Sequence, residues 1–314
     1  MQVEITYKQR VSSEECSRFL ATRAITQATA KLLLLILIGI ILIIGEVFEM
    51  DSPLAYVGGK SKLSRQIIDM IPDHTTYCEV CFGGGWVFFR KDESKYEIIN
   101  DLDSDLIAFY RCVKNHLVEF ISQFKWLLAS REQFEDYKSQ LSGRGLTDIQ
   151  KAVRYYYLQR QAFGGKVAGR TFGTAVAMPP RINLLRVEED LSDVHLRLTR
   201  TIVENLPWDE FVQRYDHPDT FFYLDPPYFR KPVYKHNFKG IEDFEKMNSI
   251  LSEIKGKFLL SINDTPEIRH TFKNFRMDEV SLTYTVGKDN SLEAKELLIY
   301  NYDIKPPDGV FDWG

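Results

Sequence analysis

The chain has 314 residues, 44% of them hydrophobic, and a formal net charge of −4. A chain of this length and composition can bury one large hydrophobic core or two modest ones. Taken as an average, the negative charge argues against a polyanionic partner such as DNA, but the basic residues are concentrated in two stretches that contain no acid.

The first 49 residues differ from the rest of the chain. Residues 32–44 form an unbroken apolar run, preceded by basic residues. A membrane-spanning helix needs about 20 apolar residues, so this run is closer to a signal-peptide core or an interfacial segment. Met50 lies just before the first motif, and we therefore expect it to be the native start, with residues 1–49 an extension outside the fold that carries the motifs. Membrane contact by a real anchor is the alternative.

A glycine pair opens the part of the chain that carries motifs. Residues 53–60 read Pro-Leu-Ala-Tyr-Val-Gly-Gly-Lys, and we expect a helix over residues 60–71 with its isoleucines on the buried face. Lys60, at the start of this helix, can either meet the carboxylate of a cofactor or face solvent.

A strand, a glycine loop and a second strand follow. Residues 77–82 read as a strand, three glycines occupy residues 83–85, and residues 96–99 form another strand that ends beside Asp101. Glycines in this place let the backbone turn tightly and lie close against a cofactor. An acid at the end of the second strand is placed to hold ribose hydroxyls. Alone, this pattern is also typical of nicotinamide and flavin enzymes.

Another buried strand ends in the most informative motif of the chain. Residues 220–224 read Thr-Phe-Phe-Tyr-Leu, a continuous run of the kind found in parallel strands that are covered on both faces. Asp225-Pro226-Pro227-Tyr228 follows, where the carboxyl end of such a strand is expected to meet ligands. Asp225 and the carbonyl of Pro226 can accept hydrogen bonds from an amino group, while Tyr228 stacks on the heterocycle that carries it.

Four motifs, in this order, resemble those of the Dam-type DNA adenine methyltransferases over residues 53 to about 303. They are residues 53–60, residues 79–89, Asn100-Asp101 and Asp225-Pro226-Pro227-Tyr228. The resemblance implies an α/β fold, namely a Rossmann-like S-adenosylmethionine-dependent methyltransferase sheet with an inserted, mostly helical DNA-recognition domain. It also implies methyl transfer from S-adenosylmethionine to the N-6 amino group of a flipped-out adenine in double-stranded DNA.

The same resemblance assigns roles to individual residues. The cofactor-binding residues would be Tyr56, Lys60, Glu79, Gly83, Gly85, Asp101 and Asp225. The catalytic residues would be Asp225, Pro226 and Tyr228, and no metal would be needed. Two places depart from the family pattern: Val80-Cys81 stands where many relatives have proline and phenylalanine, and Trp86 replaces a small residue.

Residues 116–199 interrupt the alternation of strands and helices, and we interpret them as a mostly helical target-recognition insertion. Within it, residues 151–187 contain seven basic residues and no acid, with aromatic residues between them. Such a stripe is typical of nucleic-acid binding. The candidates for DNA contact are Arg160, Lys166 and Arg170, with Phe163 as a stacking side chain. The alternative is a solvated helix face followed by a flexible loop. Residues 226–240, after the catalytic motif, are the second acid-free stretch.

The remaining segments complete a catalytic and cofactor-binding domain of residues 50–115 and 200–305, followed by a tail of residues 306–314. Asp103 is expected to cap a helix that begins at Ser104. Residues 201–205, 258–262 and 296–300 are expected to be strands. Residues 241–254 are expected to be an amphipathic helix whose buried face is formed by Phe244, Met247, Leu251 and Ile254.

The four cysteines are not expected to form a metal site. Cys78 and Cys81 make a Cys-x-x-Cys pair, but no second pair exists. We expect packing cysteines in a reduced, cytoplasmic chain. Together with the resemblance to Dam-type methyltransferases, this leads us to expect a protein encoded by a bacterium or a phage.

Two alternatives stay open at this point. Cytosine N-4 methyltransferases use a similar geometry, but they more often carry serine before the two prolines, so Asp225 favours adenine. A catalytically silent DNA-binding relative is the other alternative, because Val80, Cys81 and Trp86 depart from the family pattern.

Overall fold

The structure is a computed structural model, and it describes residues 50–304 apart from residue 142, residues 174–180 and residues 287–289. From Met50 the chain forms one compact unit. Among the described residues, no helix is long and apolar enough to cross a membrane. The apolar run of residues 32–44, the expected extension and the tail of residues 306–314 lie outside the described residues.

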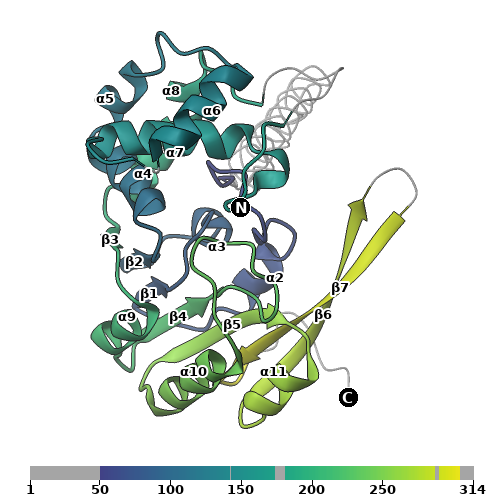
Figure 1. The fold of residues 1–314 in the computed structure, drawn as a ribbon. Coiled ribbons are helices and arrows are strands. Elements are labelled where there is room, and N and C mark those ends of the chain that lie inside the picture. The colour runs from purple at the N-terminus through teal and green to yellow at the C-terminus, as the bar shows by residue number, and fades with distance from the viewer. Residues whose placement is uncertain (1–49, 142, 174–180, 287–289, 305–314) are drawn as a thin grey trace, which may run out of the picture. The chain divides into compact units, whose positions relative to one another are not determined.

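A seven-stranded sheet forms the centre of the fold (Figure 1). Its strands are β1 Thr76–Glu79, β2 Tyr96–Asn100, β3 Ile202–Glu204, β4 Thr220–Leu224, β5 Lys257–Asn263, β6 Arg276–Val286 and β7 Asn290–Tyr300. They lie in the order β3-β2-β1-β4-β5-β7-β6, with the first five parallel and with β7 antiparallel to both of its neighbours. The chain winds outward in opposite directions from β1 and β4. Ligands of open parallel sheets bind at such a switch point, beyond the carboxyl ends of the strands.

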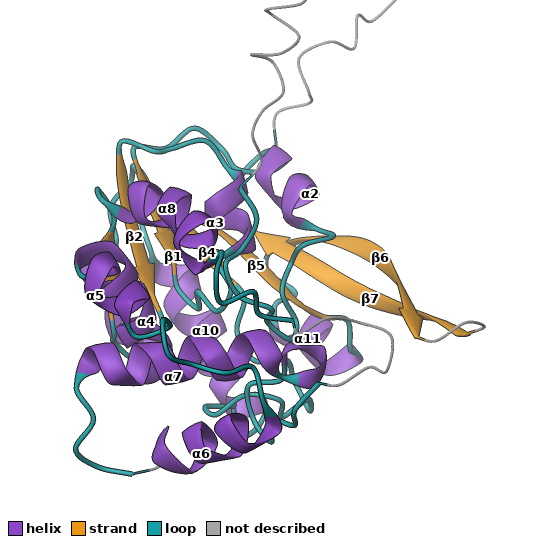
Figure 2. Cartoon of the chain, turned by 90° about the horizontal axis from the view of Figure 1, so that it is seen from above, coloured by secondary structure: helices purple, strands orange, loops and turns teal. Residues whose placement is uncertain are grey.

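Helices cover both faces of the sheet (Figure 2). On one side lie α2 Ser64–Asp69, α3 Trp86–Arg90 and α4 Ser104–Asn115, and on the other α9 Trp208–Tyr215, α10 Ile241–Glu253 and α11 Pro266–Thr271. Strand β4 joins the two layers, because Phe221 and Tyr223 belong to one core cluster and Phe222 and Leu224 to the other. Because both of its faces are covered, β4 is buried along its whole length. The expected Rossmann-like α/β sheet is confirmed.

Most of the elements expected from the sequence are confirmed. Asp103 caps α4, since its Oδ1 accepts a hydrogen bond from the amide of Asp105 at 3.1 Å. The helix expected over residues 60–71 begins only at Ser64, because the chain first makes a turn in which Leu63 N and Ser64 N donate to Lys60 O. Strand β6 was not expected. Charged and polar residues follow one another along it, which the position of an outermost strand permits.

The insertion consists of α5 Leu117–Ser122, α6 Arg131–Leu141, α7 Asp148–Gln161, the short 3-10 helix η1 Phe163–Gly165 and α8 Val187–Leu198. Its helices share a core with α4, where the rings of Phe109 and Tyr156 stack at 5.4 Å. All three tyrosines of residues 155–157 are buried in α7. The aromatic part of the expected DNA-binding stripe is therefore wrong for these three residues, which pack in the core of the protein.

The insertion also docks on the first motif of the chain. The amide of Val57 donates to Gly165 O at 2.9 Å, and Gln159 Nε2 donates to Ala55 O at 2.6 Å. Gly165 has a φ of +63°, and a Cβ at this position would lie 2.8 Å from Ala55 O. Only glycine fits both the backbone conformation and this close approach.

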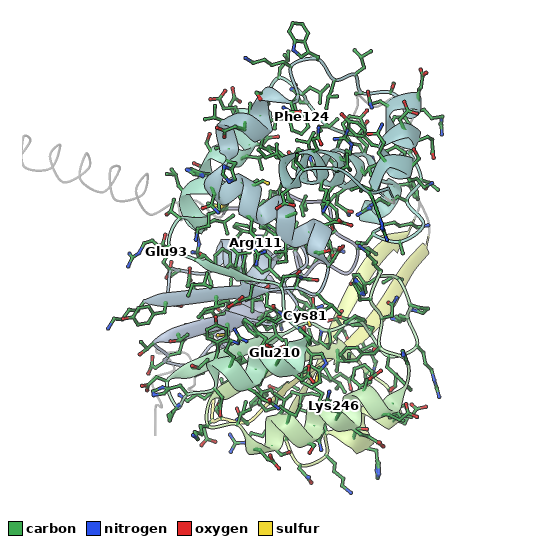
Figure 3. All side chains as sticks on the ribbon, turned by 60° about the vertical axis from the view of Figure 1, so that its left-hand side comes forward. Cys81, Glu93, Arg111, Phe124, Glu210 and Lys246 are labelled. Carbon is green, nitrogen blue, oxygen red and sulfur yellow. The ribbon has the colours of Figure 1, made fainter. Side chains whose placement is uncertain are left out.

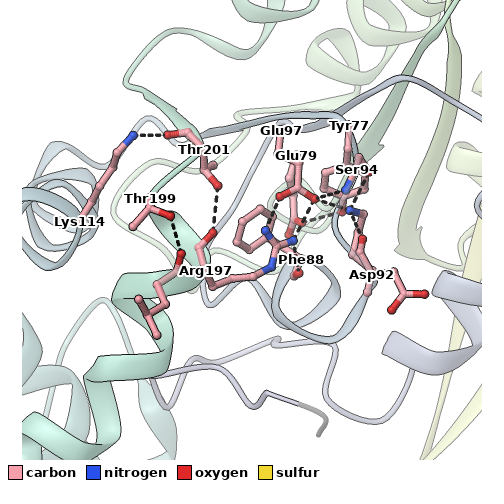
Figure 4. Close-up of polar contacts among 12 residues, drawn as sticks. Tyr77, Glu79, Phe88, Asp92, Ser94, Glu97, Lys114, Arg197, Thr199 and Thr201 are labelled. Atoms are coloured by element: carbon pink, nitrogen blue, oxygen red, sulfur yellow. Dashed lines mark hydrogen bonds and ion pairs between the residues drawn. The ribbon is translucent and has the colours of Figure 1, made fainter. Parts of the chain in front are cut away.

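A buried ionic cluster fastens the end of α8 to β2 (Figure 4). The guanidinium group of Arg197 donates to both carboxylate oxygens of Glu97 and, at 3.1 Å, to Phe88 O. Lys91 Nζ donates to Glu97 at 2.5 Å, and its charge lies 4.2 Å from the ring centre of Tyr77. Burial favours the neutral acid, but hydrogen bonds from Arg197 and Lys91 outweigh it and lower the pKa of Glu97.

Candidate active site

A single cavity lies at the carboxyl ends of β1, β2 and β4, where the strand order switches. All seven residues expected to bind a cofactor line it: Tyr56, Lys60, Glu79, Gly83, Gly85, Asp101 and Asp225. Cys81, which also lines the cavity, lies between Phe124 of the insertion and the helices α9 and α10, which carry Glu210 and Lys246 (Figure 3).

The glycine loop bends tightly because two of its residues adopt a left-handed conformation. Gly83 and Gly85 have φ angles of +50° and +68°. A Cβ on Gly83 would lie 3.0 Å from the ring of Tyr56, and one on Gly85 would lie 2.4 Å from the ring of Phe82. The loop therefore needs glycine for its conformation and for its packing, and its backbone forms one wall of the cavity.

Asp101 connects this loop to the start of α4. Its Oδ2 accepts from the amide of Gly83 and its Oδ1 from the amide of Asp103, both at 2.9 Å. Burial raises the pKa of Asp101 to about 6, while these backbone hydrogen bonds oppose the change. The carboxylate lines the cavity at the end of β2, so its position agrees with the one expected for a ribose-binding acid.

Two tyrosines, Tyr56 and Tyr234, form another part of the cavity wall. The rings of Tyr56 and Tyr234 stack with centroids 6.0 Å apart, and the hydroxyl of Tyr234 donates to Val57 O at 3.0 Å. Gly58, with a φ of +74°, leaves no room for a side chain, since a Cβ there would lie 2.3 Å from the Tyr234 hydroxyl. Sequence reasoning missed Tyr234, because nothing in the residues around it indicates that the loop after the catalytic motif folds back onto residues 56–58.

Trp86, one of the two departures from the family pattern, also lines the cavity. A Cβ on Gly59 would lie 2.7 Å from its indole nitrogen, so this glycine makes space for the large ring. On its other side, the guanidinium group of Arg90 lies 4.6 Å from the centre of the ring. The absence of a side chain at Gly59 thus leaves room for the large ring beside the glycine loop.

Lys60 organises the motif Asp225-Pro226-Pro227-Tyr228. Its ammonium group donates to Asp225 Oδ1 at 2.5 Å and to the Tyr228 hydroxyl at 2.7 Å. Ser261 Oγ donates to the same Asp225 oxygen at 3.3 Å. From the sequence, Lys60 could either meet a cofactor carboxylate or face solvent; in the structure its ammonium group contacts two side chains of the motif. Asp225 keeps 19% of its side chain exposed, at the edge of the cavity.

The environment of Asp225 raises the pKa of its carboxyl group toward neutral pH. Burial raises its pKa to about 6; the charge of Glu296 adds to this effect, while Lys60 and Ser261 oppose it. Asp225 is therefore mostly ionised at neutral pH. An ionised carboxylate accepts hydrogen bonds and donates none, which suits it to grip an amino group.

A family model described as D12 class N6 adenine-specific DNA methyltransferase matches residues 56–286, a span that contains the glycine loop, Asp101 and the catalytic motif. The chain belongs to this family. It is an adenine-specific DNA methyltransferase, and the cytosine N-4 and catalytically silent alternatives are set aside.

Individual relatives resemble most of this methyltransferase. Type II methyltransferase M.CviBI of Paramecium bursaria Chlorella virus NC1A is 25% identical over 256 residues, which cover 78% of this chain and 97% of that protein. A type II methyltransferase of Lactococcus lactis subsp. cremoris is 26% identical over 79% of this chain and 94% of its own length. A DNA adenine methylase of Vibrio cholerae is 22% identical over 76% and 90%.

In this methyltransferase, Glu79 is the most buried acid of the cavity lining, with 2% of its surface exposed. It accepts a hydrogen bond from the hydroxyl of Tyr77 at 2.7 Å. Burial raises the pKa of Glu79 to about 8; the neighbouring charge of Asp225 adds to the rise, and the Tyr77 hydrogen bond opposes it. Glu79 is therefore mostly protonated at neutral pH in this structure, and its carboxyl group can donate as well as accept.

The four candidates for DNA contact lie in different environments. Arg170 donates to Gln159 Oε1 and covers the ring of Tyr155, while Arg160 donates to Pro53 O at 3.4 Å and lies 3.8 Å from Asp190. Both arginines are thus half-buried and held by the protein. Lys166 and Phe163 are exposed, Phe163 with 56% of its surface.

No cluster of potential metal ligands exists among the residues that the structure describes. Cys78, Cys81 and Cys112 are free thiols; Cys78 packs in the core, and Cys81 packs against the same core cluster while it lines the cavity. The strand expected over residues 77–82 is shorter, because β1 ends at Glu79 and Cys81 belongs to the following loop.

Proposed function

We propose that this methyltransferase uses S-adenosylmethionine as its methyl donor, binds it in the cavity at the ends of β1, β2 and β4, and holds the target adenine with Asp225, Pro226 and Tyr228. The observation that carries the proposal is the meeting of Asp225 with the glycine loop in one cavity, although the two are about 140 residues apart in sequence.

The lining of the cavity fits such a donor. The backbone of the glycine loop lies open to it, as a close approach to a nucleoside requires. Asp101 lies at the end of β2, where two hydroxyl groups can donate to its oxygens. The aromatic rings of Tyr56 and Trp86 offer flat apolar surface for an adenine ring or an aliphatic chain. When bound, the donor supplies a methyl group on a positively charged sulfur.

Asp225 would make the amine of the target reactive. The lone pair of the exocyclic nitrogen is delocalised into the purine ring, so the nitrogen is a weak nucleophile. Hydrogen bonds from its two N–H groups to Asp225 and to Pro226 O would localise that lone pair toward the methyl group. Lys60 and Ser261 fix Asp225 Oδ1, which leaves Oδ2 for the substrate. Correct placement of the two reactants then supplies much of the rate.

Proton balance follows from the same contact. The nitrogen forms a bond to carbon as the bond from carbon to sulfur breaks, and the methylated nitrogen then carries one proton too many. Asp225, with a pKa of about 6, is the nearest acceptor for that proton and can release it to solvent.

The base has to leave the DNA stack before it reaches Asp225, at a cost of a few kcal/mol. Tyr228 would offer a replacement stack, because its ring lies beside Asp225 and is held by Lys60, whose ammonium group lies 4.8 Å from the centre of the ring. Lys166 and Phe163, the two exposed candidates, are proposed to contact the duplex from the insertion.

The test is a single-turnover measurement of labelled methyl transfer to duplex DNA, with donor and DNA saturating so that weaker binding does not enter. Asp225→Asn is expected to slow transfer by roughly 100-fold or more, as loss of a group aimed at the reacting centre does. Asp219→Asn, an exposed change at the other end of β4, is the matched control and should leave the rate unchanged. A rate for Asp225→Asn close to that of the unchanged protein would overturn the proposal.

A further inference from the structure

Glu296 is a buried acid in β7 that belongs to none of the motifs. Only 4% of its surface is exposed, and Oε2 is buried without a hydrogen-bond partner. The nearest cation is the ammonium group of Lys60, whose nitrogen lies 3.8 Å from Oε2. A buried carboxylate destabilises the fold unless hydrogen bonds or a cation compensate it, which raises the question of what Glu296 does beside the catalytic motif.

The strand pairing explains how a residue so late in the chain reaches the site. Glu296 is paired with Asn263 across β5 and β7, and Ser261, two residues earlier on the same face of β5, contacts Asp225. Asn263 is itself buried; its Nδ2 donates to Phe229 O, next to the catalytic tyrosine, at 3.2 Å. These side chains form a polar layer under Asp225 and Tyr228.

Lys60 therefore lies between two carboxylates. Asp225 takes the short contact of 2.5 Å and Glu296 the longer one of 3.8 Å. Burial raises the pKa of Tyr228, and the charges of Asp225 and Glu296 raise it further. The tyrosine thus stays neutral, and its oxygen accepts from Lys60. Lys60 is thus held between Asp225 and Glu296, and it is Lys60 that contacts the Tyr228 hydroxyl.

We propose that Glu296 is a positioning residue for methyl transfer: it holds the Lys60 ammonium group and the Tyr228 hydroxyl in place, so that Asp225 presents its remaining oxygen to the target amine. This inference rests on the proposed role of Asp225. Glu296 itself does not touch the substrate. Its effect passes through Lys60, which makes one contact with each of the two side chains of the motif.

The charge of Glu296 should also affect how the rate of methyl transfer depends on pH, which a packing role alone would not do. An ionised Glu296 favours protonation of Asp225, so replacing it by neutral glutamine should lower the pKa of Asp225. Because methyl transfer needs the carboxylate form, the acid limb of the rate profile should then move to lower pH. A purely structural loss would lower the rate at every pH and leave the limb in place.

The experiment compares Glu296→Gln with Glu279→Gln, an exposed acid of the neighbouring strand β6, in single turnovers from about pH 5 to about pH 9. Glu296→Gln is expected to slow transfer by roughly tenfold to a hundredfold at the alkaline end, as a misplacement of about 1 Å does. Its acid limb should move to lower pH, so the deficit narrows as the solution becomes more acidic. Dissociation constants for donor and DNA should change by less than about threefold. Glu279→Gln should match the unchanged protein.

Two results would overturn the inference. One is a Glu296→Gln protein with the normal rate and the normal acid limb. The other is a slower protein whose acid limb has not moved. Two further measurements separate a positioning role of Glu296 from a general loss of stability. Melting temperatures report the stability of the variant. In the double variant with Lys60→Met, Glu296→Gln should lower the rate little further, because that protein already lacks the ammonium group. Asp225→Asn is measured in parallel. If this variant stays active, the proposed role of Asp225 is wrong. If Asp225→Asn is inactive while Glu296→Gln behaves like the unchanged protein, only the proposed role of Glu296 is wrong.

Discussion

The amide of Gly83 donates a hydrogen bond to Asp101 Oδ2 at 2.9 Å, so the acid at the end of β2 closes the glycine loop that follows β1. The other oxygen of Asp101 accepts from the amide of Asp103, the residue that caps α4. One carboxylate therefore fixes three things at once: the loop, the start of a helix and one wall of the cavity.

Asp101→Ala is expected to loosen the glycine loop and weaken donor binding. Hydrogen bonds to a charged group contribute about 1.5–3 kcal/mol, which corresponds to roughly tenfold to a hundredfold in the dissociation constant. Titration calorimetry with S-adenosylmethionine measures this change. Asp105→Ala, in the first turn of α4, serves as the control, because its side chain meets the half-exposed Lys235. Equal affinities for the two variants would contradict the prediction.

Arg197→Ala is expected to destabilise the protein strongly. It leaves Glu97 buried with Lys91 as its remaining cation, and the loss of one partner from a buried ion pair costs about 3–5 kcal/mol. Arg214→Ala breaks an exposed pair with Glu210, which contributes less than about 1 kcal/mol. Urea unfolding followed by circular dichroism gives both values. The prediction is wrong if the two variants unfold at similar urea concentrations.

Glu79→Gln should stabilise the ligand-free protein by an amount that depends on pH. The pKa of Glu79 is raised by burial to about 8, from an ordinary value near 4.5 in the unfolded chain. Between these two values the folded state binds more protons than the unfolded state, so this residue makes the fold less stable as pH rises through that window. Below this pH window, Glu79→Gln should change the free energy of unfolding little. Above it, glutamine removes the whole destabilisation that the buried, ionised Glu79 causes.

Melting temperatures from about pH 5 to about pH 9 test this sign. The difference between Glu79→Gln and the unchanged protein should grow with pH and level off above about pH 8. Glu93→Gln, an exposed change in the loop before β2, is the control (Figure 3). A difference that shrinks as pH rises would show that the folded protein prefers the ionised form of Glu79.

Lys166→Ala should weaken binding to duplex DNA of any sequence and make it less dependent on salt. A lysine that neutralises one phosphate contributes about one unit to the slope of log K against log salt. Lys138→Ala, an exposed lysine of α6 that pairs with Glu135, is the control. Fluorescence anisotropy at several salt concentrations gives the slopes. Identical slopes for Lys166→Ala and the unchanged protein would remove Lys166 from the DNA interface.

Local sequence predicted the part of the site that depends on single strands. The apolar run before Asp225 and the glycines after β1 each indicate a strand that ends at a ligand, and the parallel pairing of Glu79 with Tyr223 places the two ends side by side. These signals are contained in a few adjacent residues, and for that reason they can be read without a structure.

The contacts that sequence reasoning missed depend on how distant segments meet. Tyr234 belongs to a loop that folds back over Val57, and Glu296 reaches Lys60 only because β7 pairs with β5. Tyr156 was interpreted as part of a surface stripe because the sequence of α7 does not say which face meets α4. In each case the information resides in tertiary packing, which no local pattern carries.

The hydrogen bonds from Val57 to Gly165 and from Gln159 to Ala55 have a consequence for engineering. A chimaera that exchanges residues 116–199 for those of another enzyme would break this seam unless residues 53–60 travel with them. We therefore expect the DNA-sequence preference of another enzyme to be transferred when residues 53–60 and 116–199 are exchanged together, and to be lost when residues 116–199 are exchanged alone.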